Sequence, residues 1–149
     1  MLLKEFSFIK ESIKFKEKEN LKISKANVGW HLDHSLKVIN SVYDALKISN
    51  PKDYKKEFVT LRLITFALGR FPRGRVKSPK RVLPPELILK EDLESQLELV
   101  IKNLDSLKQF NKNQYFTHPL FKHLNKKQTV KFLKLHTKHH LKIVKDILK

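Results

Sequence analysis

The sequence contains no cysteine, which excludes a disulfide framework, a thiolate metal site and a cysteine nucleophile. Only 3 glycines and 6 prolines occur among the 149 residues, whereas 40% of the residues are hydrophobic. This composition is typical of a folded chain long enough to bury a core, so we expect residues 1–149 to form a single domain.

Long hydrophobic runs are also missing. No segment approaches the roughly 20 apolar residues that a membrane-spanning helix requires. Charged residues interrupt the N-terminal segment too often for a signal peptide. We therefore expect a cytoplasmic protein with no membrane partner.

Acidic residues are scarce, since 15 Asp and Glu stand against 32 Lys and Arg, for a net charge of +17. Such a charge is typical of proteins that bind nucleic acid. Here, however, lysines are spread over every segment, as they would be if they only solvated helix exteriors. A non-enzymatic protein that binds nucleic acid or acts as an adaptor is therefore the alternative function and not the favoured one.

The spacing of apolar residues predicts helices along almost the whole chain. The predicted helices span residues 3–18, 25–47, 52–68, 90–110 and 126–148. Strand signals are nearly absent, and residues 114–124 are expected to form an ordered connector with one helical turn. The predicted fold is all-α, an antiparallel four-helix bundle with one additional helix.

Helix-terminating residues support these boundaries. Ser24 and Asn125 are predicted N-caps, and Pro51 is expected to start the third helix. Gly69 is expected to end that helix. Its predicted buried face consists of Phe58, Leu61, Ile64, Thr65 and Leu68.

A basic segment follows the third predicted helix. Residues 70–85 contain four prolines and are expected to form an extended loop. Its cations are Arg70, Arg73, Arg75, Lys77, Lys80 and Arg81. They are candidates for binding an anionic group such as a phosphate or a carboxylate. A solvated flap, or a contact with an acidic patch on a second subunit, would explain the same residues.

Two histidines of the last predicted helix share one face. His136 and His140 are four residues apart and both turn toward the apolar stripe, whereas His139 points toward solvent. In the helix over residues 25–47, His31 lies at the boundary of core and solvent, and His34 lies about 130° from the stripe. His31 is therefore the better candidate for a third metal ligand, and His34 remains an alternative candidate if the helix is rotated about its axis.

Three imidazoles from two facing helices form a ligand set that suits a divalent transition metal and leaves a position open for water or substrate. The alternative is that these histidines are packed or hydrogen-bonded residues of the core. Asp33 and Asp44 could orient a ligating imidazole, although a surface position suits both. Trp30, beside His31, is expected to pack at the core or its rim, and His123 is expected to be solvated.

Three motifs add a family resemblance. The strings Trp-His-Leu-Asp-His-Ser-Leu at 30–36, His-Pro-Leu-Phe at 118–121 and His-Thr-Lys-His-His-Leu at 136–141 together resemble the DinB/YfiT-like metalloenzyme superfamily. The resemblance is closest to its branch with a His-Pro-x-Phe segment before the last helix. It implies a four-helix bundle that holds a divalent ion, usually nickel or zinc, and it implies a homodimer. Carried over by position, the metal ligands are His31, His136 and His140.

The sequence also departs from this family. Lys122 follows Phe121 at a position where relatives often have glycine, and the residues after the last histidine lack the Arg and Gln that relatives commonly carry.

The resemblance and the histidine spacing together predict a metal-dependent enzyme of the hydrolase or thiol-dependent transferase kind. Because the chain has no cysteine, a thiol would have to come from a low-molecular-weight cofactor. The substrate is expected to be a small molecule, which the basic segment would guide if it is anionic. His34 and His118 are candidates for residues that support the ligands, and no general base can be named.

Overall fold

The computed structural model describes residues 2–71 and 80–149. Its helices and strands are α1 (Leu3–Ser12), α2 (Val28–Ile48), α3 (Thr60–Leu68), α4 (Lys90–Ser106), β1 (Tyr115–His118), β2 (Lys122–Asn125) and α5 (Lys126–Ile147). Short 3₁₀ helices occur at η1 (Ile13–Phe15), η2 (Pro51–Asp53), η3 (Lys80–Val82) and η4 (Leu107–Gln109). The chain is therefore mostly helical, as predicted. None of the helices described is long and apolar enough to cross a membrane.

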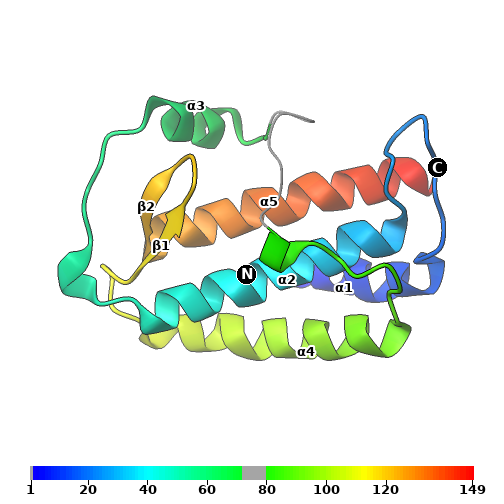
Figure 1. Cartoon of the computed structure of the whole chain (residues 1–149), viewed down its shortest axis with the longest axis horizontal. Coiled ribbons are helices and arrows are strands. Elements are labelled where there is room, and N and C mark those ends of the chain that lie inside the picture. The colour runs from blue at the N-terminus through cyan, green and yellow to red at the C-terminus, as the bar shows by residue number, and fades with distance from the viewer. Residues whose placement is uncertain (1, 72–79) are drawn as a thin grey trace.

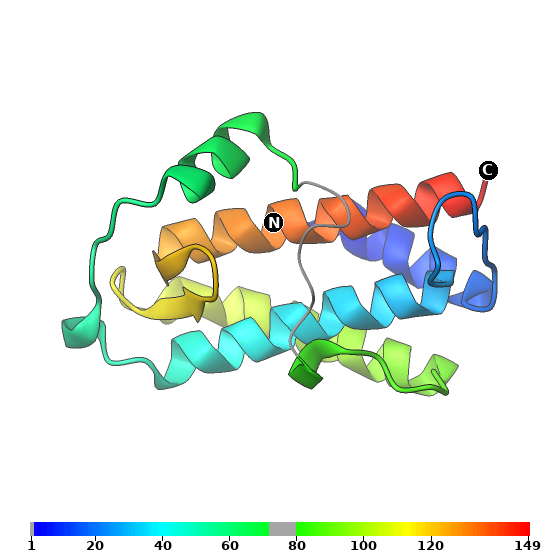
Figure 2. The ribbon, with the colours of Figure 1, turned by 45° about the horizontal axis from the view of Figure 1, so that its top comes forward.

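Helix α2 lies at the centre of the molecule. It packs lengthwise against both α4 and α5, and the shorter α1 contacts α4 and α5 from behind (Figures 1 and 2). The side chains of α2 at the predicted apolar spacing are almost fully buried; they are Val28, Leu32, Leu36, Ile39, Val42 and Leu46.

A short stretch near the start of α2 is enclosed on every side. All six residues over 31–36 are buried, polar ones included. The enclosure comes from η1 and η3, which contact α2 in addition to the two long helices. A helix covered in this way has no solvent face near its start, so residues far from its apolar stripe are buried as well.

The ends of α2 and α5 are set by asparagine. The side chain of Asn27 accepts a hydrogen bond from the backbone N–H of Trp30 at 2.9 Å, so α2 begins at Val28 and the prediction of Ser24 as its cap is wrong. Asn125 is the N-cap of α5, as predicted, and forms a reciprocal capping box with Gln128.

The predicted connector over residues 114–124 is a β-hairpin instead of a loop with a helical turn. Strands β1 and β2 pair antiparallel, with Tyr115 opposite Asn125 and His118 opposite Lys122. Each strand has only four residues, which is too short for alternation in the sequence to reveal it. The hairpin packs on α2 and α5 and buries Phe116 and Phe121.

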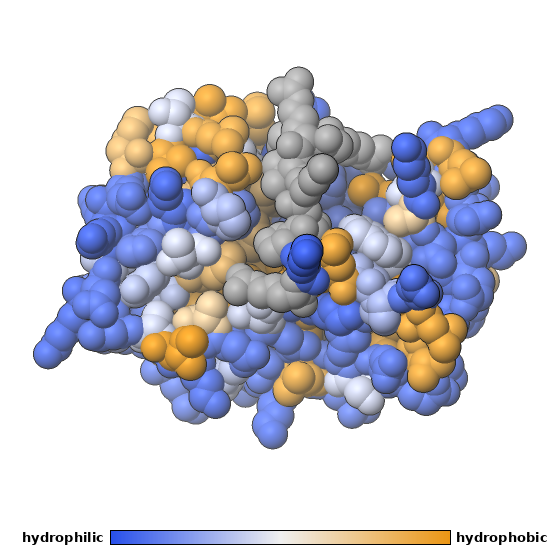
Figure 3. Space-filling view, viewed as in Figure 1, coloured by the Kyte–Doolittle hydropathy of each residue, from blue (hydrophilic) through white to orange (hydrophobic). Residues whose placement is uncertain are grey.

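Helix α3 differs most from its prediction. It begins at Thr60 and not at residue 52 as predicted. The short helix η2 ends at Asp53, and the chain between η2 and α3 is extended. Of the predicted buried face, only Thr65 is buried, and the apolar side chains of that face stay exposed. They form part of the hydrophobic surface that Figure 3 shows at the position of α3 in Figure 1. Gly69 ends the helix as predicted, with a φ of 65° and its N–H donating to the carbonyl of Thr65.

Candidate metal centre

Three histidines meet where α2 packs against α5. His34 comes from α2, and His136 and His140 lie one turn apart on α5. One ring nitrogen from each residue lies within 4.8 Å of the other two. The ring centroids are 4.6 Å apart for His136 and His140, and 4.7 Å apart for His34 and His140. Three imidazoles this close, from two rigid helices, form a set that could hold one metal ion.

Hydrogen bonding fixes the tautomer of His34. Its Nδ1 lies 2.8 Å from the carbonyl oxygen of Val82 in η3. A carbonyl only accepts, so Nδ1 carries the hydrogen, and in the neutral ring the lone pair is on Nε2. A backbone partner that holds the far nitrogen of an imidazole in this way is the usual support of a metal-bound histidine.

His136 contributes a buried nitrogen that lacks a partner. Its Nδ1 is shielded from solvent and has no hydrogen-bond partner within residues 2–71 and 80–149. Around it, the rings of Phe132 and Phe71 lie at centroid distances of 5.6 Å and 6.1 Å. An unsatisfied polar atom in apolar surroundings costs about 1–3 kcal/mol, and a metal ion would remove that cost. The residues present therefore fit a bound ion.

Burial keeps these rings neutral. Loss of solvent lowers the pKa of His136 and of His140 well below the usual 6.5, and the neighbouring histidines lower it further. Burial also lowers the pKa of His34, against the opposing effect of its bond to Val82. Neutral imidazole is the form that binds a metal, so the site is in its binding form near neutral pH.

His31, the ligand predicted from α2, lies next to this set but is not part of it. It is buried, and its Nδ1 lies 3.0 Å from Nδ1 of His140. The position of His34 explains the difference. Its ring was expected to point away from the apolar stripe, but η3 covers that side of α2 and encloses it at 2% exposure.

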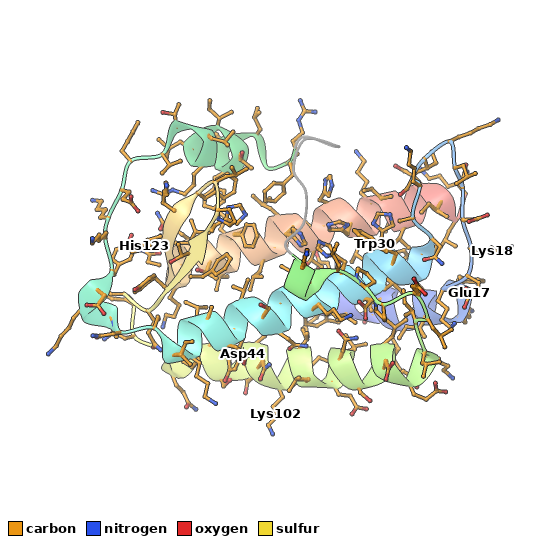
Figure 4. All side chains as sticks on the ribbon, in the orientation of Figure 1. Glu17, Lys18, Trp30, Asp44, Lys102 and His123 are labelled. Carbon is orange, nitrogen blue, oxygen red and sulfur yellow. The ribbon has the colours of Figure 1, made fainter. Side chains whose placement is uncertain are left out.

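The other candidate histidines lie outside the set. Nδ1 of His118 accepts from the backbone N–H groups of Leu120 and Phe121 and so closes the hairpin turn. His123, expected to be solvated, accepts from the N–H of Lys55, and its ring is tilted by 30° against that of Tyr115 at a centroid distance of 4.4 Å; Figure 4 shows it on the hairpin. His139 is half-buried, with its ring 5.1 Å from that of His140.

The cationic candidates are only partly described. Arg70 and Lys80 are exposed, and Arg81 lies within η3. The predicted anion-binding residues Arg73, Arg75 and Lys77 lie outside the described residues. On either side of them, Phe71 contacts the ring of His136 and Val82 is bonded to His34.

The two aspartates of α2 differ in exposure. Asp33 is buried, forms an ion pair with Lys37 at 2.8 Å and accepts from Gln96 at 2.8 Å, so its expected surface position is wrong. Asp44 is exposed, as expected.

Trp30 forms part of the wall of the site. Its ring stacks on His34 with centroids 5.0 Å apart and planes 22° apart, and it lies 6.1 Å from the ring of His140. In Figure 4 it stands on α2 on the side toward α5. The tryptophan packs at the rim of the core, as predicted, and covers the imidazoles.

Residues 57–147 match the model of a family described as "Protein of unknown function (DUF1569)", which is more than half of the chain. The chain belongs to this family. The DUF1569 match includes His136 and His140 and begins after α2, so it does not include His34. No curated protein and no solved structure matches the chain.

Proposed function

We propose that this protein is a divalent-metal-dependent enzyme of the hydrolase or thiol-dependent transferase kind, with its ion on His34, His136 and His140. The observation that carries the proposal is the convergence of three buried or half-buried imidazole nitrogens within 4.8 Å. The Nδ1 atom of His136, which is buried and has no hydrogen-bond partner in the part of the chain that the structure describes, supports it. Three motifs that resemble the DinB/YfiT-like superfamily, and occur in the same order, also support it. From the same resemblance we propose nickel or zinc as the metal and a DinB-like four-helix bundle as the fold.

Three protein ligands leave at least one coordination position for water or substrate, as in catalytic rather than structural metal sites. A divalent ion there would lower the pKa of a bound water to about 7 or bind a thiolate from a low-molecular-weight cofactor. The chain itself would hold the three rings neutral and in place, with Trp30, Phe71 and Phe132 limiting the access of solvent.

The basic residues over 70–81 are proposed to guide an anionic substrate. Two residues beside the basic ones support this proposal, since Phe71 and Val82 both contact histidines of the candidate site. A cationic segment joined to a metal centre at both ends would raise the local concentration of anions.

The experiment that tests the metal centre is elemental analysis of untagged protein after expression with added metal and dialysis without chelator. We expect about one transition-metal equivalent per chain, lost in His136→Ala and His34→Ala and retained in His123→Ala, which lies on the hairpin. The absence of metal from wild type, even after reloading with zinc or nickel, would refute the proposal.

The charge of +17 supports the alternative, a non-enzymatic protein that binds nucleic acid. That function predicts binding that weakens steeply with salt and is unaffected by His136→Ala. Affinity that stays constant between low and moderate salt would exclude it.

A further inference from the structure

His31 contacts the metal centre through His140 and contacts the loop before α2 through Ser24. Its Nδ1 lies 3.0 Å from Nδ1 of His140, and its Nε2 lies 3.0 Å from the hydroxyl oxygen of Ser24. The ring is buried at 4% exposure. Both ring nitrogens are therefore engaged, and His31 would have to give up one of these contacts to bind a metal itself.

The direction of the bond between the two histidines follows from the role of His140. Its Nδ1 faces His31, so Nε2 is the nitrogen that remains for a metal, and it must carry a lone pair. A neutral imidazole with a lone pair on Nε2 has its hydrogen on Nδ1. His140 is then the donor and Nδ1 of His31 the acceptor.

The same reasoning fixes the tautomer of His31. Because its Nδ1 accepts, its single hydrogen is on Nε2 and is donated to Ser24 Oγ. Ser24 is held in turn, since its hydroxyl oxygen also accepts from the N–H of Ala26 at 3.1 Å. The rings of Trp30 and His31 form a T-shaped pair with centroids 5.2 Å apart, which further restricts the rotation of the imidazole.

We propose that His31 is a positioning residue of this metal centre, which accepts the Nδ1 hydrogen of His140, directs Nε2 of that ring to the ion and is itself oriented by Ser24. The inference rests on the proposed metal-binding function. A partner that accepts the second hydrogen of a ligating histidine fixes its orientation and makes it a stronger ligand, and loss of such a partner typically costs 10–100-fold in metal affinity.

The first test is the zinc affinity of the full chain, measured by competition with a chromophoric chelator. We expect His31→Phe, which keeps an aromatic ring but cannot accept, to bind zinc about 10–100-fold more weakly than wild type. His31→Gln, whose amide oxygen can accept, should recover part of that loss. Ser24→Ala should weaken binding less than His31→Phe does, and the control His139→Gln should retain the wild-type affinity.

The second test needs no substitution at His31. Nitrogen-15 NMR of zinc-loaded wild type should show the hydrogen of His140 on Nδ1 and that of His31 on Nε2. A hydrogen on Nδ1 of His31 would overturn the inference, and so would an affinity of His31→Phe equal to that of wild type. If His31→Phe does not fold, the NMR result decides.

These outcomes are distinct from a failure of the proposed function. Wild type that binds neither zinc nor nickel would reject the metal centre, and the role of His31 with it. Zinc binding by wild type that is lost in His34→Ala but unchanged in His31→Phe would leave the metal centre in place and reject the positioning role alone.

Discussion

The Nδ1 atom of His34 donates to the carbonyl oxygen of Val82 over 2.8 Å, so the candidate metal centre is bonded directly to the segment that follows the basic residues. This bond joins parts of the chain 48 residues apart and sets the tautomer of the ring. The unfolded chain lacks this bond, and with it the ring orientation that the proposed metal site needs. Metal binding should therefore stabilise the fold.

We expect zinc at 100 times its dissociation constant to raise the free energy of unfolding by about 2.7 kcal/mol. For a chain of this length that corresponds to an increase in Tm on the order of 5–10 °C. Thermal unfolding followed by circular dichroism, with and without zinc, measures the shift. His34→Ala should abolish it and His139→Gln should retain it; an equal shift in His34→Ala would show that zinc binds elsewhere.

His118 makes stability depend on pH. Burial lowers its pKa from 6.5 to about 4, and its Nδ1 must stay unprotonated to accept from Leu120 and Phe121. Between these two pH values the unfolded chain binds the proton and the folded chain does not. The stability due to the neutral ring is fully present above pH 6.5 and is lost as the pH falls toward 4.

Urea unfolding at pH 7 and pH 4.5 checks this expectation. The free energy of unfolding should be lower at pH 4.5. His118→Asn, whose side-chain oxygen can accept the same N–H groups without titrating in this range, should show a smaller decrease. An identical decrease in the variant would assign the pH dependence to other groups, among them His136 and His140, whose pKa values are also lowered.

Sequence periodicity favoured both α5 histidines of the cluster, but on α2 it favoured His31 over His34, which it left open. His136 and His140 lie on the inner face of a helix that still has a solvent side, so their spacing was informative. The start of α2 is enclosed by η1 and η3, and a projection that assumes one solvent face cannot rank His31 against His34 there. The contact that decides between them, with Val82, is 48 residues away in sequence.

The same limit explains the errors in α3. Its apolar spacing predicted a buried face, but spacing does not say whether a partner covers that face, and most of those side chains are exposed. Arg62 anchors α3 to the hairpin. It is charged, so a pattern of apolar residues does not identify it. It is 5% exposed and donates to the carbonyl oxygens of Phe121, His123 and Glu57.

We expect Arg62→Met to destabilise the protein by about 2–4 kcal/mol, because three carbonyl groups at the hairpin and before α3 lose a charged donor. Chemical denaturation of wild type and variant measures the difference. Arg70→Met is the matched control, since Arg70 is exposed just after α3, and its effect should stay within about 0.5 kcal/mol. Equal effects of the two substitutions would contradict the anchoring role of Arg62.

The turn of the hairpin has a backbone strain that glycine would relieve. Lys122 has a φ of 57°, in the left-handed region that costs a side chain with a Cβ about 1–2 kcal/mol. Lys122→Gly removes this cost but gives the unfolded chain more conformational freedom, so the net gain should be about 0.5–1 kcal/mol. Lys122→Ala keeps the Cβ and should gain nothing, which separates backbone strain from loss of the lysine charge. Urea midpoints of the three proteins provide the comparison, and a gain in Lys122→Ala equal to that in Lys122→Gly would assign the effect to charge.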